Sequence, residues 1–225
     1  MLEGIHKIHL IGIGGSGMRA IANILIQKGY EVSGSDVKES DVIERFRQMG
    51  ATVHIGHNAD YVQGVDAVVR STAIREDNPE IVAAKEQGIT ILHRSDIVKA
   101  VLDVTNGIAV AGAHGTTSTT SMIGQILVEG QMEPTVIIGG EVDYLKGSSC
   151  LGKGEYSVVE ADESDGSFLK LRPKTIVITN IEDDHMDHYK TMENLLNAFC
   201  QFVETLPVDG KAVVCGDNDN IRYVM

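Results

Sequence analysis

The residues with the clearest chemical potential form one short segment, Gly112-Ala113-His114-Gly115-Thr116-Thr117-Ser118. It follows an apolar run at residues 108–111 and precedes apolar residues at helical spacing from residue 122 onward. A strand, a glycine-containing turn and a hydroxyl-rich helix start are the layout of a phosphate-binding loop, where backbone N–H groups and the helix dipole favour an anion. A Walker loop carries a lysine just before the hydroxyl that reaches magnesium, and Thr116 occupies that position. The segment therefore predicts an ATP site without its lysine.

Acidic residues gather after two later apolar runs. The run at residues 156–159 leads into residues 160–165, and the run at residues 174–178 leads to residues 182–188. The carboxyl ends of parallel strands meet at one edge of a sheet, where the phosphate loop is also expected. Carboxylates repel phosphates unless a divalent cation lies between them. Each cluster alone is equally compatible with a solvated acidic loop, but the two together favour a magnesium site.

A second glycine-rich turn lies near the N-terminus. An apolar strand at residues 8–11 leads into it, and apolar residues at helical spacing follow from residue 18. Asp36 ends the next predicted strand, 19 residues after the last glycine of the turn, so its carboxylate could accept from a ribose or sugar hydroxyl. This pattern favours a nucleotide-binding fold but is poor support for NAD, and a turn needed only for packing is the alternative. The turn is Gly12-Ile13-Gly14-Gly15-Ser16-Gly17.

Strands and helices alternate through both halves of the chain. The pattern predicts an α/β protein: a Rossmann-like doubly wound parallel sheet at residues 1–104, then a partial P-loop ATPase-type α/β domain at residues 105–225. Asn78 and Pro79 predict a helix start, with Asn as the cap and Pro at the first helical position. Ser95 is expected to cap a second helix that runs to residue 101.

Composition limits the function classes. The formal net charge of −13 argues against nucleic acid as the main partner, because phosphate backbones need clustered Lys and Arg. Cys150, Cys200 and Cys215 have no Cys-x-x-Cys spacing and suit reduced thiols. There is no signal-peptide pattern and no apolar run near ~18 residues, so we expect a cytoplasmic protein without a membrane partner. His54, His57 and His93 are interpreted as structural.

Taken together, these motifs resemble those of the Mur ligase family, and most closely its alanine-adding branch. The resemblance covers essentially the whole chain and implies an ATP-dependent amide-bond former of peptidoglycan synthesis. ATP is expected to phosphorylate the lactyl carboxylate of UDP-N-acetylmuramic acid, and the amine of L-alanine then attacks the acyl phosphate. The matching segments are the turn at residues 12–18, Ser33-Gly34-Ser35-Asp36, Gly112-Ala113-His114-Gly115, residues 160–165 with Ser167-Phe168-Leu169, Thr179-Asn180-Ile181 and residues 184–189.

The resemblance also implies roles for individual residues. Thr117 matches the loop hydroxyl on magnesium, Glu160 a carboxylate ligand, and His185 the ligand of a second magnesium near the substrate carboxylate. The loop from Gly112 to Ser118 is expected to bind ATP. The UDP end of the substrate is expected at Gly12, Gly14, Gly15, Ser16, Gly17, Ser35 and Asp36.

This sequence departs from the family pattern in its phosphate loop, in its length, and in having no lysine at residues 192–206, where other branches of the family place a magnesium-supporting lysine. Thr116 replaces the phosphate-binding lysine, a loss expected to cost a few kcal/mol of transition-state stabilisation, or roughly a hundredfold in rate. Ala113 stands where the family usually has threonine. Family members continue through a third domain, so we expect this chain to lack parts required for turnover. Two alternatives remain: a ligase relative that binds the UDP-sugar without ATP turnover, and an NAD-dependent dehydrogenase.

Overall fold

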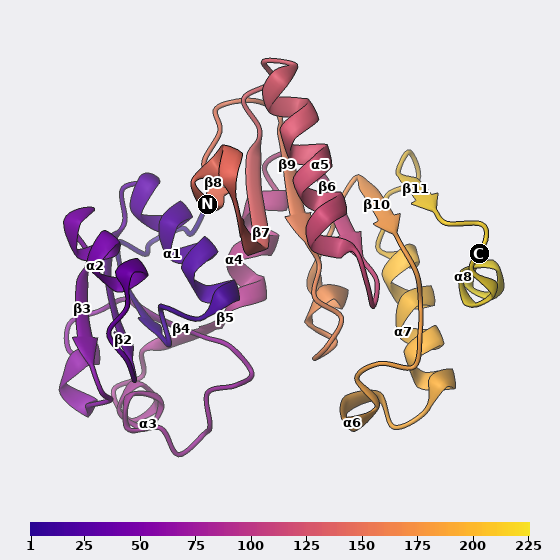
Figure 1. Cartoon of the computed structure of the whole chain (residues 1–225). Helices are drawn as coiled ribbons and strands as arrows, with labels where there is room; N and C mark the ends of the chain where they lie inside the picture. The colour runs from indigo at the N-terminus through magenta and orange to yellow at the C-terminus, as the bar shows by residue number, and fades with distance from the viewer.

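The computed structural model describes residues 1–225, with one β-sheet in each half of the chain (Figure 1). The first sheet is parallel throughout, in the order β3-β2-β1-β4-β5. The strand order reverses beside β1, and doubly wound sheets bind ligands at the carboxyl ends of the strands at such a switch point. Its strands are β1 (Lys7–Ile11), β2 (Glu31–Asp36), β3 (Thr52–Ile55), β4 (Ala67–Arg70) and β5 (Thr90–His93). Its helical segments are α1 (Ser16–Gln27), α2 (Asp41–Gln48), η1 (Ala59–Val62), α3 (Pro79–Glu86) and α4 (Arg94–Leu102).

The second sheet has the strand order β11-β10-β6-β9-β7-β8 and is mixed, because β7 and β8 pair antiparallel. Strand β6 lies between β10 and β9, so the segments that follow these three strands emerge side by side. The strands are β6 (Asn106–Ala111), β7 (Thr135–Val142), β8 (Gly147–Cys150), β9 (Tyr156–Glu160), β10 (Thr175–Ile178) and β11 (Lys211–Val214). The helical segments are α5 (Thr116–Glu129), η2 (Asp143–Leu145), η3 (Ser167–Lys170), α6 (Met186–Tyr189), α7 (Met192–Glu204) and α8 (Asp219–Val224).

The predicted α/β fold, with a parallel doubly wound sheet followed by a second α/β unit, is confirmed. The boundary at residues 104 and 105 stays a prediction, because α4 packs on α1 as well as on β6 and β9. The antiparallel strand β8 was not predicted. Its residues, Gly-Ser-Ser-Cys, are small or polar, so they lack the apolar pattern by which strands are recognised. None of the helices combines the length and the hydropathy that crossing a membrane requires.

The two helix starts predicted from the sequence had different outcomes. Asn78 caps α3 as expected, since its side-chain oxygen accepts from the backbone N–H of Glu80 at 2.9 Å and Pro79 is the first helical residue. The start of α4 was placed too late. His93, not Ser95, is its N-cap, because the His93 ring accepts from the Ser95 N–H while the Asp96 carboxylate accepts from the His93 N–H at 2.7 Å. Arg94 therefore becomes the first residue of the helix.

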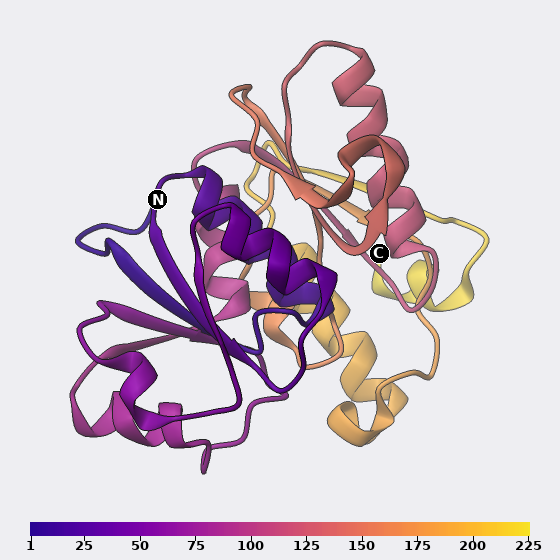
Figure 2. The same ribbon diagram turned by 60° about the vertical axis from the view of Figure 1, so that its left-hand side comes forward.

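Helix α1 joins the two halves of the molecule. Figure 2 shows it lying between the first sheet and the β7–β8 hairpin, which it contacts. The Asn23 amide donates to the Ser149 carbonyl at 2.9 Å, and the Ser149 hydroxyl donates to the Ala20 carbonyl at 2.8 Å. A single cluster of 35 buried residues draws on both halves. This shared core fixes the position of the first sheet's carboxyl edge relative to that of the second.

Candidate functional site

The loop between β6 and α5 has the backbone of a tight turn. Gly112 (φ +138°) and Gly115 (φ +78°) adopt positive φ values that favour glycine, and Gly115 is the N-cap of α5. A Cβ on Gly112 would lie 2.2 Å from the Thr179 hydroxyl, so the loop packs directly on the segment after β10. The Asn180 side chain accepts from the His114 N–H and donates to the His114 carbonyl, both at 2.9 Å. Thr179 and Asn180 therefore hold the loop in shape, a role that the sequence did not reveal.

The first turn of α5 presents unpaired backbone donors. The first hydrogen bond of the helix runs from the Thr119 N–H to the Gly115 carbonyl at 3.0 Å, so the N–H groups of Thr116, Thr117 and Ser118 have no acceptor within the helix. Ser118 and His114 are exposed at this end. These N–H groups are available to an anion from solvent, and the phosphate site expected at this loop stays a prediction.

The Glu160 carboxylate lies at the carboxyl end of β9, beside the loop. One of its oxygens accepts from the hydroxyls of Thr116 and Thr117, each at 2.8 Å. The other accepts from the Gly139 N–H at 2.6 Å, where β7 comes close enough that a Cβ on Gly139 would lie 2.9 Å from the carboxylate. The structure thus brings Thr117 and Glu160 into direct contact. It also shows what Thr116 does in the position of a Walker lysine: its hydroxyl bonds the same oxygen.

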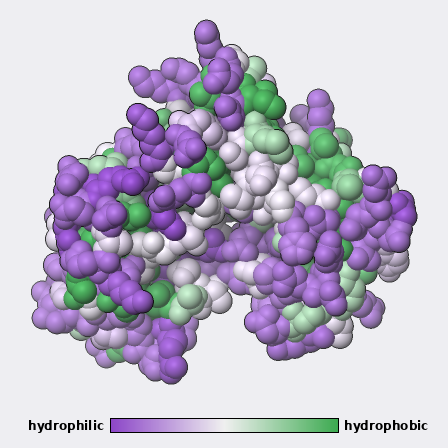
Figure 3. Space-filling model, viewed as in Figure 1, coloured by the Kyte–Doolittle hydropathy of each residue, from purple (hydrophilic) through white to green (hydrophobic).

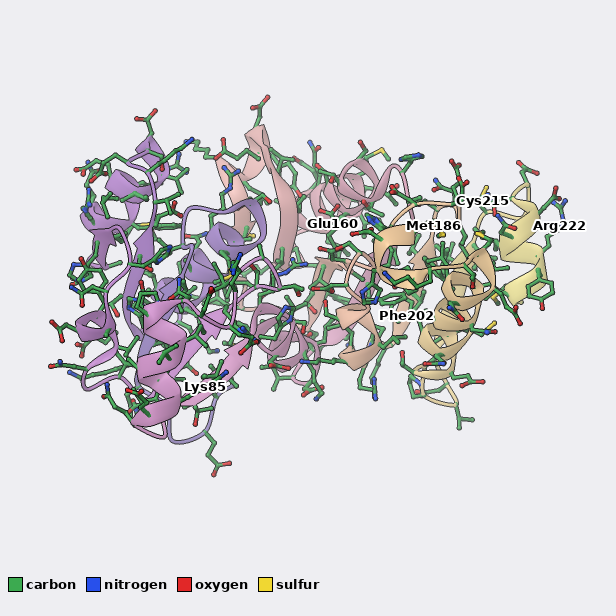
Figure 4. All side chains as sticks on the ribbon, turned by 90° about the horizontal axis from the view of Figure 1, so that it is seen from below. Lys85, Glu160, Met186, Phe202, Cys215 and Arg222 are labelled. Atoms are coloured by element: carbon green, nitrogen blue, oxygen red, sulfur yellow. The ribbon has the colours of Figure 1, made fainter.

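A cavity of about 260 Å³ lies between this loop and the first sheet. In Figure 4, Glu160 lies near the middle of the molecule, between the first sheet and α7. His185 lines the same cavity and adopts a left-handed backbone (φ +57°) at the start of α6. Its Nε2 lies 3.7 Å from the Glu163 carboxylate. Burial raises the pKa of Glu163, and the negative charge of Asp162 raises it further.

The residues predicted to bind magnesium divide into two parts. Thr117 and Glu160 are in contact, whereas His185 lines the same cavity as Glu160 and bonds neither residue. No three His, Cys, Asp or Glu side chains come close enough together to hold a metal by themselves. The hydroxyl of Thr117 and the carboxylate oxygen of Glu160 are 2.8 Å apart. Two oxygen atoms this close together could both reach one small hard cation. An oxygen pair of this kind would suit magnesium, which prefers oxygen ligands.

The glycine turn after β1 is held by β2. The Ser35 carbonyl accepts from the N–H groups of Gly12 and Ile13 at 2.8 and 3.0 Å. An Asp36 oxygen accepts from the Gly14 N–H at 2.9 Å, so part of this carboxylate orders the turn itself. The Ser35 side chain is fully buried and donates to Glu80 at 2.7 Å. Ser35 therefore lies beneath the turn and supports it, and its assignment to the substrate site stays a prediction.

A larger cavity, of about 840 Å³, opens above this turn. Gly12, Gly14, Gly15 and Asp36 line one side of it, the loop at residues 71–74 lines another, and Asp187 faces them from α6. Figure 3 shows the hollow between the two lobes of the molecule, at the lower edge of the view. The smaller cavity shares part of its wall. The residues common to both, here called the junction residues, are Ser16, Gly17, Arg94, Asp162 and His185.

A buried polar network lies beneath the turn and supports it, and no sequence motif predicted this network. Glu80 is fully buried on α3, where its carboxylate lies 2.8 Å from the His9 ring and 2.7 Å from the His57 ring. Burial opposes ionisation of Glu80, but hydrogen bonds from His9, Ser35 and His57 lower its pKa below the usual value. Because Ser35 also holds the glycine turn through its carbonyl, the network fixes the floor of the larger cavity.

Comparison with protein families decides the affiliation. Residues 7–104 match the model described as "Mur ligase family, catalytic domain", and residues 110–225 match "Mur ligase middle domain". The chain belongs to the Mur ligase family. The Mur ligase motifs identified in the sequence therefore belong to two adjoining family domains, and the two cavities lie where these domains meet.

Individual Mur ligases agree with this affiliation. The chain is 47% identical to a UDP-N-acetylmuramate–L-alanine ligase of Desulfatibacillum aliphaticivorans over 96% of its length, and 49% identical to one of Desulforamulus reducens over 97%. It spans about half the length of these curated relatives, 48% in both cases.

Solved structures give the same result for the fold. A UDP-N-acetylmuramate-alanine ligase from Thermotoga maritima superposes with a TM-score of 0.89 at 32% identity, covering 97% of this chain and 51% of the other. A UDP-N-acetylmuramate:L-alanyl-gamma-D-glutamyl-meso-diaminopimelate ligase from Neisseria meningitides gives 0.91 at 27% identity, covering 98% and 74%. Both are Mur ligases, and both act on UDP-N-acetylmuramate by their names.

Proposed function

We propose that this chain supplies the sugar-nucleotide site and part of the ATP site of an ATP-dependent ligase, which joins L-alanine to the lactyl carboxylate of UDP-N-acetylmuramic acid in peptidoglycan synthesis. The observation that carries this proposal is the shared wall of the two cavities. A glycine turn that suits a diphosphate and a loop that suits ATP phosphates open onto the same five junction residues. A reaction between the two ligands requires such a meeting point.

The chemistry requires the carboxylate to be activated, because its oxygen is a poor leaving group. Transfer of the terminal phosphoryl group of ATP to this carboxylate gives an acyl phosphate, and attack by the alanine amine then forms the amide and releases phosphate. Phosphoryl transfer depends mainly on alignment and charge neutralisation. In the proposal, the loop at residues 112–118 binds the ATP phosphates through its unpaired N–H groups, and Gly12, Gly14, Gly15, Ser16 and Gly17 receive the diphosphate of the sugar nucleotide.

Magnesium completes the proposed site. Thr117 and Glu160 would hold one ion, and His185 would contribute to a second near the substrate carboxylate. Magnesium supplies charge neutralisation between phosphate and carboxylate oxygens. Glu160 is already oriented for this task, because three donors fix its carboxylate against the loop.

A second candidate function follows from Thr116. Without the lysine charge, the loop has only backbone donors for ATP phosphates, because the Thr116 hydroxyl already donates to Glu160. This favours a family member that binds the sugar nucleotide but turns ATP over poorly. The substitution Thr116→Lys in this chain tests the idea. If Thr116 makes the loop a weak phosphate binder, the lysine variant should bind the ATP analogue AMP-PNP with magnesium at least tenfold more tightly than the unmodified chain, as measured by calorimetry. Met122→Lys adds the same charge at an exposed position further along α5 and is the control. Tight analogue binding by the unmodified chain, with no gain from lysine, would contradict this candidate.

The ligand class is tested by thermal unfolding. UDP-N-acetylmuramic acid at a hundred times its Kd should add about 2.7 kcal/mol to the unfolding free energy. For a chain of this size this corresponds to a rise in Tm of roughly 5–10 °C. NAD is the comparison, because a glycine turn of this kind also occurs in dehydrogenases. A shift with NAD and none with the sugar nucleotide at millimolar concentration would refute the proposed function.

A further inference from the structure

The junction between the two cavities contains one strongly cationic side chain, Arg94. Lys38 also lines the larger cavity, but it does not reach the smaller one. Arg94 is therefore the only Lys or Arg side chain that faces both cavities. An anion bound at their meeting point would lie next to its guanidinium.

The backbone places Arg94 at this point through the cap of α4. Because the His93 ring and the Asp96 carboxylate form a capping box, the helix begins at Arg94, and the side chain leaves from its first position. Nη2 of Arg94 donates to the Asp162 carboxylate, which lies in the segment after β9 of the second sheet. Asp162 is itself fixed, since its second oxygen accepts from the Ser164 N–H at 2.9 Å. The guanidinium is thus held between the two halves of the molecule.

Most of the donor capacity of Arg94 is unused. The bond to Asp162 is the only side-chain hydrogen bond that Arg94 makes, which leaves Nε and Nη1 without a protein acceptor. The side chain retains 20% of its accessible surface. Nη1 lies against the glycine turn, because a Cβ on Gly17 would come within 2.7 Å of it. Gly17 therefore leaves room for the guanidinium, in addition to shaping the turn.

We propose that Arg94 binds the carboxylate of the sugar nucleotide, the group that is to be phosphorylated, through its free donors at the junction. This inference rests on the proposed function. To react, the carboxylate must reach the smaller cavity while the diphosphate stays at the glycine turn in the larger one, and the shared wall is where both conditions are met. A planar guanidinium held by one carboxylate has a second edge available for another, and such charge-assisted bonds are strong and directional. Arg94 also offsets part of the negative charge of Asp162 and Glu163 there.

The same contact could serve only to tie the two halves together, so the test must depend on the ligand's carboxylate. UDP-N-acetylglucosamine resembles UDP-N-acetylmuramic acid but lacks the lactyl carboxylate. A site built to bond a group rejects an analogue without it. The ratio of the two dissociation constants, measured by calorimetry on the whole chain, therefore isolates the carboxylate contact from any change in stability or domain arrangement.

The variants are Arg94→Gln, Arg94→Lys and the control Arg19→Gln. Arg19 is a matched control because it also crosses between the halves, bonding Glu141 at 2.8 Å, with a similarly low exposure of 26%. It lines neither cavity. We expect the unmodified chain to bind UDP-N-acetylmuramic acid more tightly than its analogue. Arg94→Gln should reduce this preference by roughly 10- to 100-fold, Arg94→Lys should restore part of it, and Arg19→Gln should leave it unchanged.

The outcomes separate this inference from the proposed function. If the unmodified chain binds neither sugar nucleotide, the proposed function fails. If it binds both and Arg94→Gln weakens them equally, or if no preference exists to lose, Arg94 is only a structural tie and the inference is overturned. A parallel titration with AMP-PNP and ADP tests whether Arg94 binds the terminal phosphate of ATP instead of the sugar carboxylate. Loss of the preference for the triphosphate analogue, with the sugar preference retained, would assign Arg94 to the terminal phosphate instead.

Discussion

The Glu160 carboxylate offers a way to separate folding from cation binding. In Glu160→Gln one oxygen becomes an amide NH₂, while the shape of the side chain is retained. The Gly139 N–H can only donate, so it must keep the remaining oxygen as its acceptor. The hydroxyls of Thr116 and Thr117 then face the new NH₂ group. Hydroxyls rotate and can accept as well as donate, so all three partners remain satisfied.

The magnitudes follow from this count of hydrogen bonds. Glu160→Gln replaces three charge-assisted bonds by neutral ones but removes the cost of a half-buried charge, so we expect a loss of only ~1–2 kcal/mol in unfolding free energy. Glu160→Ala removes all three bonds. The two hydroxyls can turn to water, but the Gly139 N–H loses its acceptor, and we expect a loss of ~2–4 kcal/mol. Both substitutions remove the carboxylate that the proposal assigns to magnesium.

The assay combines urea unfolding with titration of AMP-PNP, first without magnesium and then with magnesium at about 5 mM, in excess over the nucleotide. In the unmodified chain, magnesium should strengthen analogue binding; in Glu160→Gln this dependence should largely disappear while the fold remains. Glu155→Gln, an exposed residue just before the same strand, is the matched control and should change neither quantity. If Glu160→Gln keeps the full magnesium dependence, the assignment of Glu160 as a cation ligand is wrong.

Further predictions concern the supports of the two cavities. Gly112→Ala should lower the unfolding free energy by at least ~2 kcal/mol and abolish AMP-PNP binding, because a Cβ at φ +138° would meet Thr179 and the Asn180 backbone. Urea unfolding measures the first effect and calorimetry the second. Normal affinity for AMP-PNP would contradict the packing argument. Asn180→Ala should weaken analogue binding by about tenfold through loss of the two bonds to His114, whereas Asn220→Ala, which loses a bond to the Ile181 carbonyl, should not. The pKa of Glu80 is lowered in the folded state, so its ionised form stabilises the fold above about pH 4.5, and this contribution is lost as the pH falls through the lower folded pKa. Glu80→Gln should therefore be ~1–3 kcal/mol less stable at pH 7 and lose less stability between pH 6 and pH 3.5; equal acid sensitivity in urea unfolding would refute this.

Much of the fold was predictable because it depends on local patterns. The alternation of apolar runs and helical spacing identified the parallel strands, and glycines at the ends of β1 and β6 marked the two turns that line the cavities. The Asn78-Pro79 start of α3 was correct because both signals act within one turn of helix. The start of α4 was missed because His93 is not a common cap residue, and its ring acts as one only together with Asp96.

The site was less predictable where it depends on contacts between distant segments. Sequence motifs suggested Thr117, Glu160 and His185, but not that Glu160 would contact Thr116 and Gly139, which come from different elements. Ser35 stood next to Asp36 in a matching motif, yet alternation of side chains along β2 turns it toward Glu80, beneath the turn. Arg94 carried no motif, and its position at the junction follows only from the way α4 packs between the two sheets.

The central claim is that the sugar nucleotide binds above the glycine turn and reaches the junction. Hydrogen–deuterium exchange with saturating UDP-N-acetylmuramic acid tests it most directly, because bound ligand slows exchange of the amides that it covers or orders. We predict protection at residues 12–18, 71–74 and 162–165, the three segments that contribute residues to the wall of the larger cavity. Protection confined to residues 112–118, or saturable binding with no protection at residues 12–18, would contradict the account.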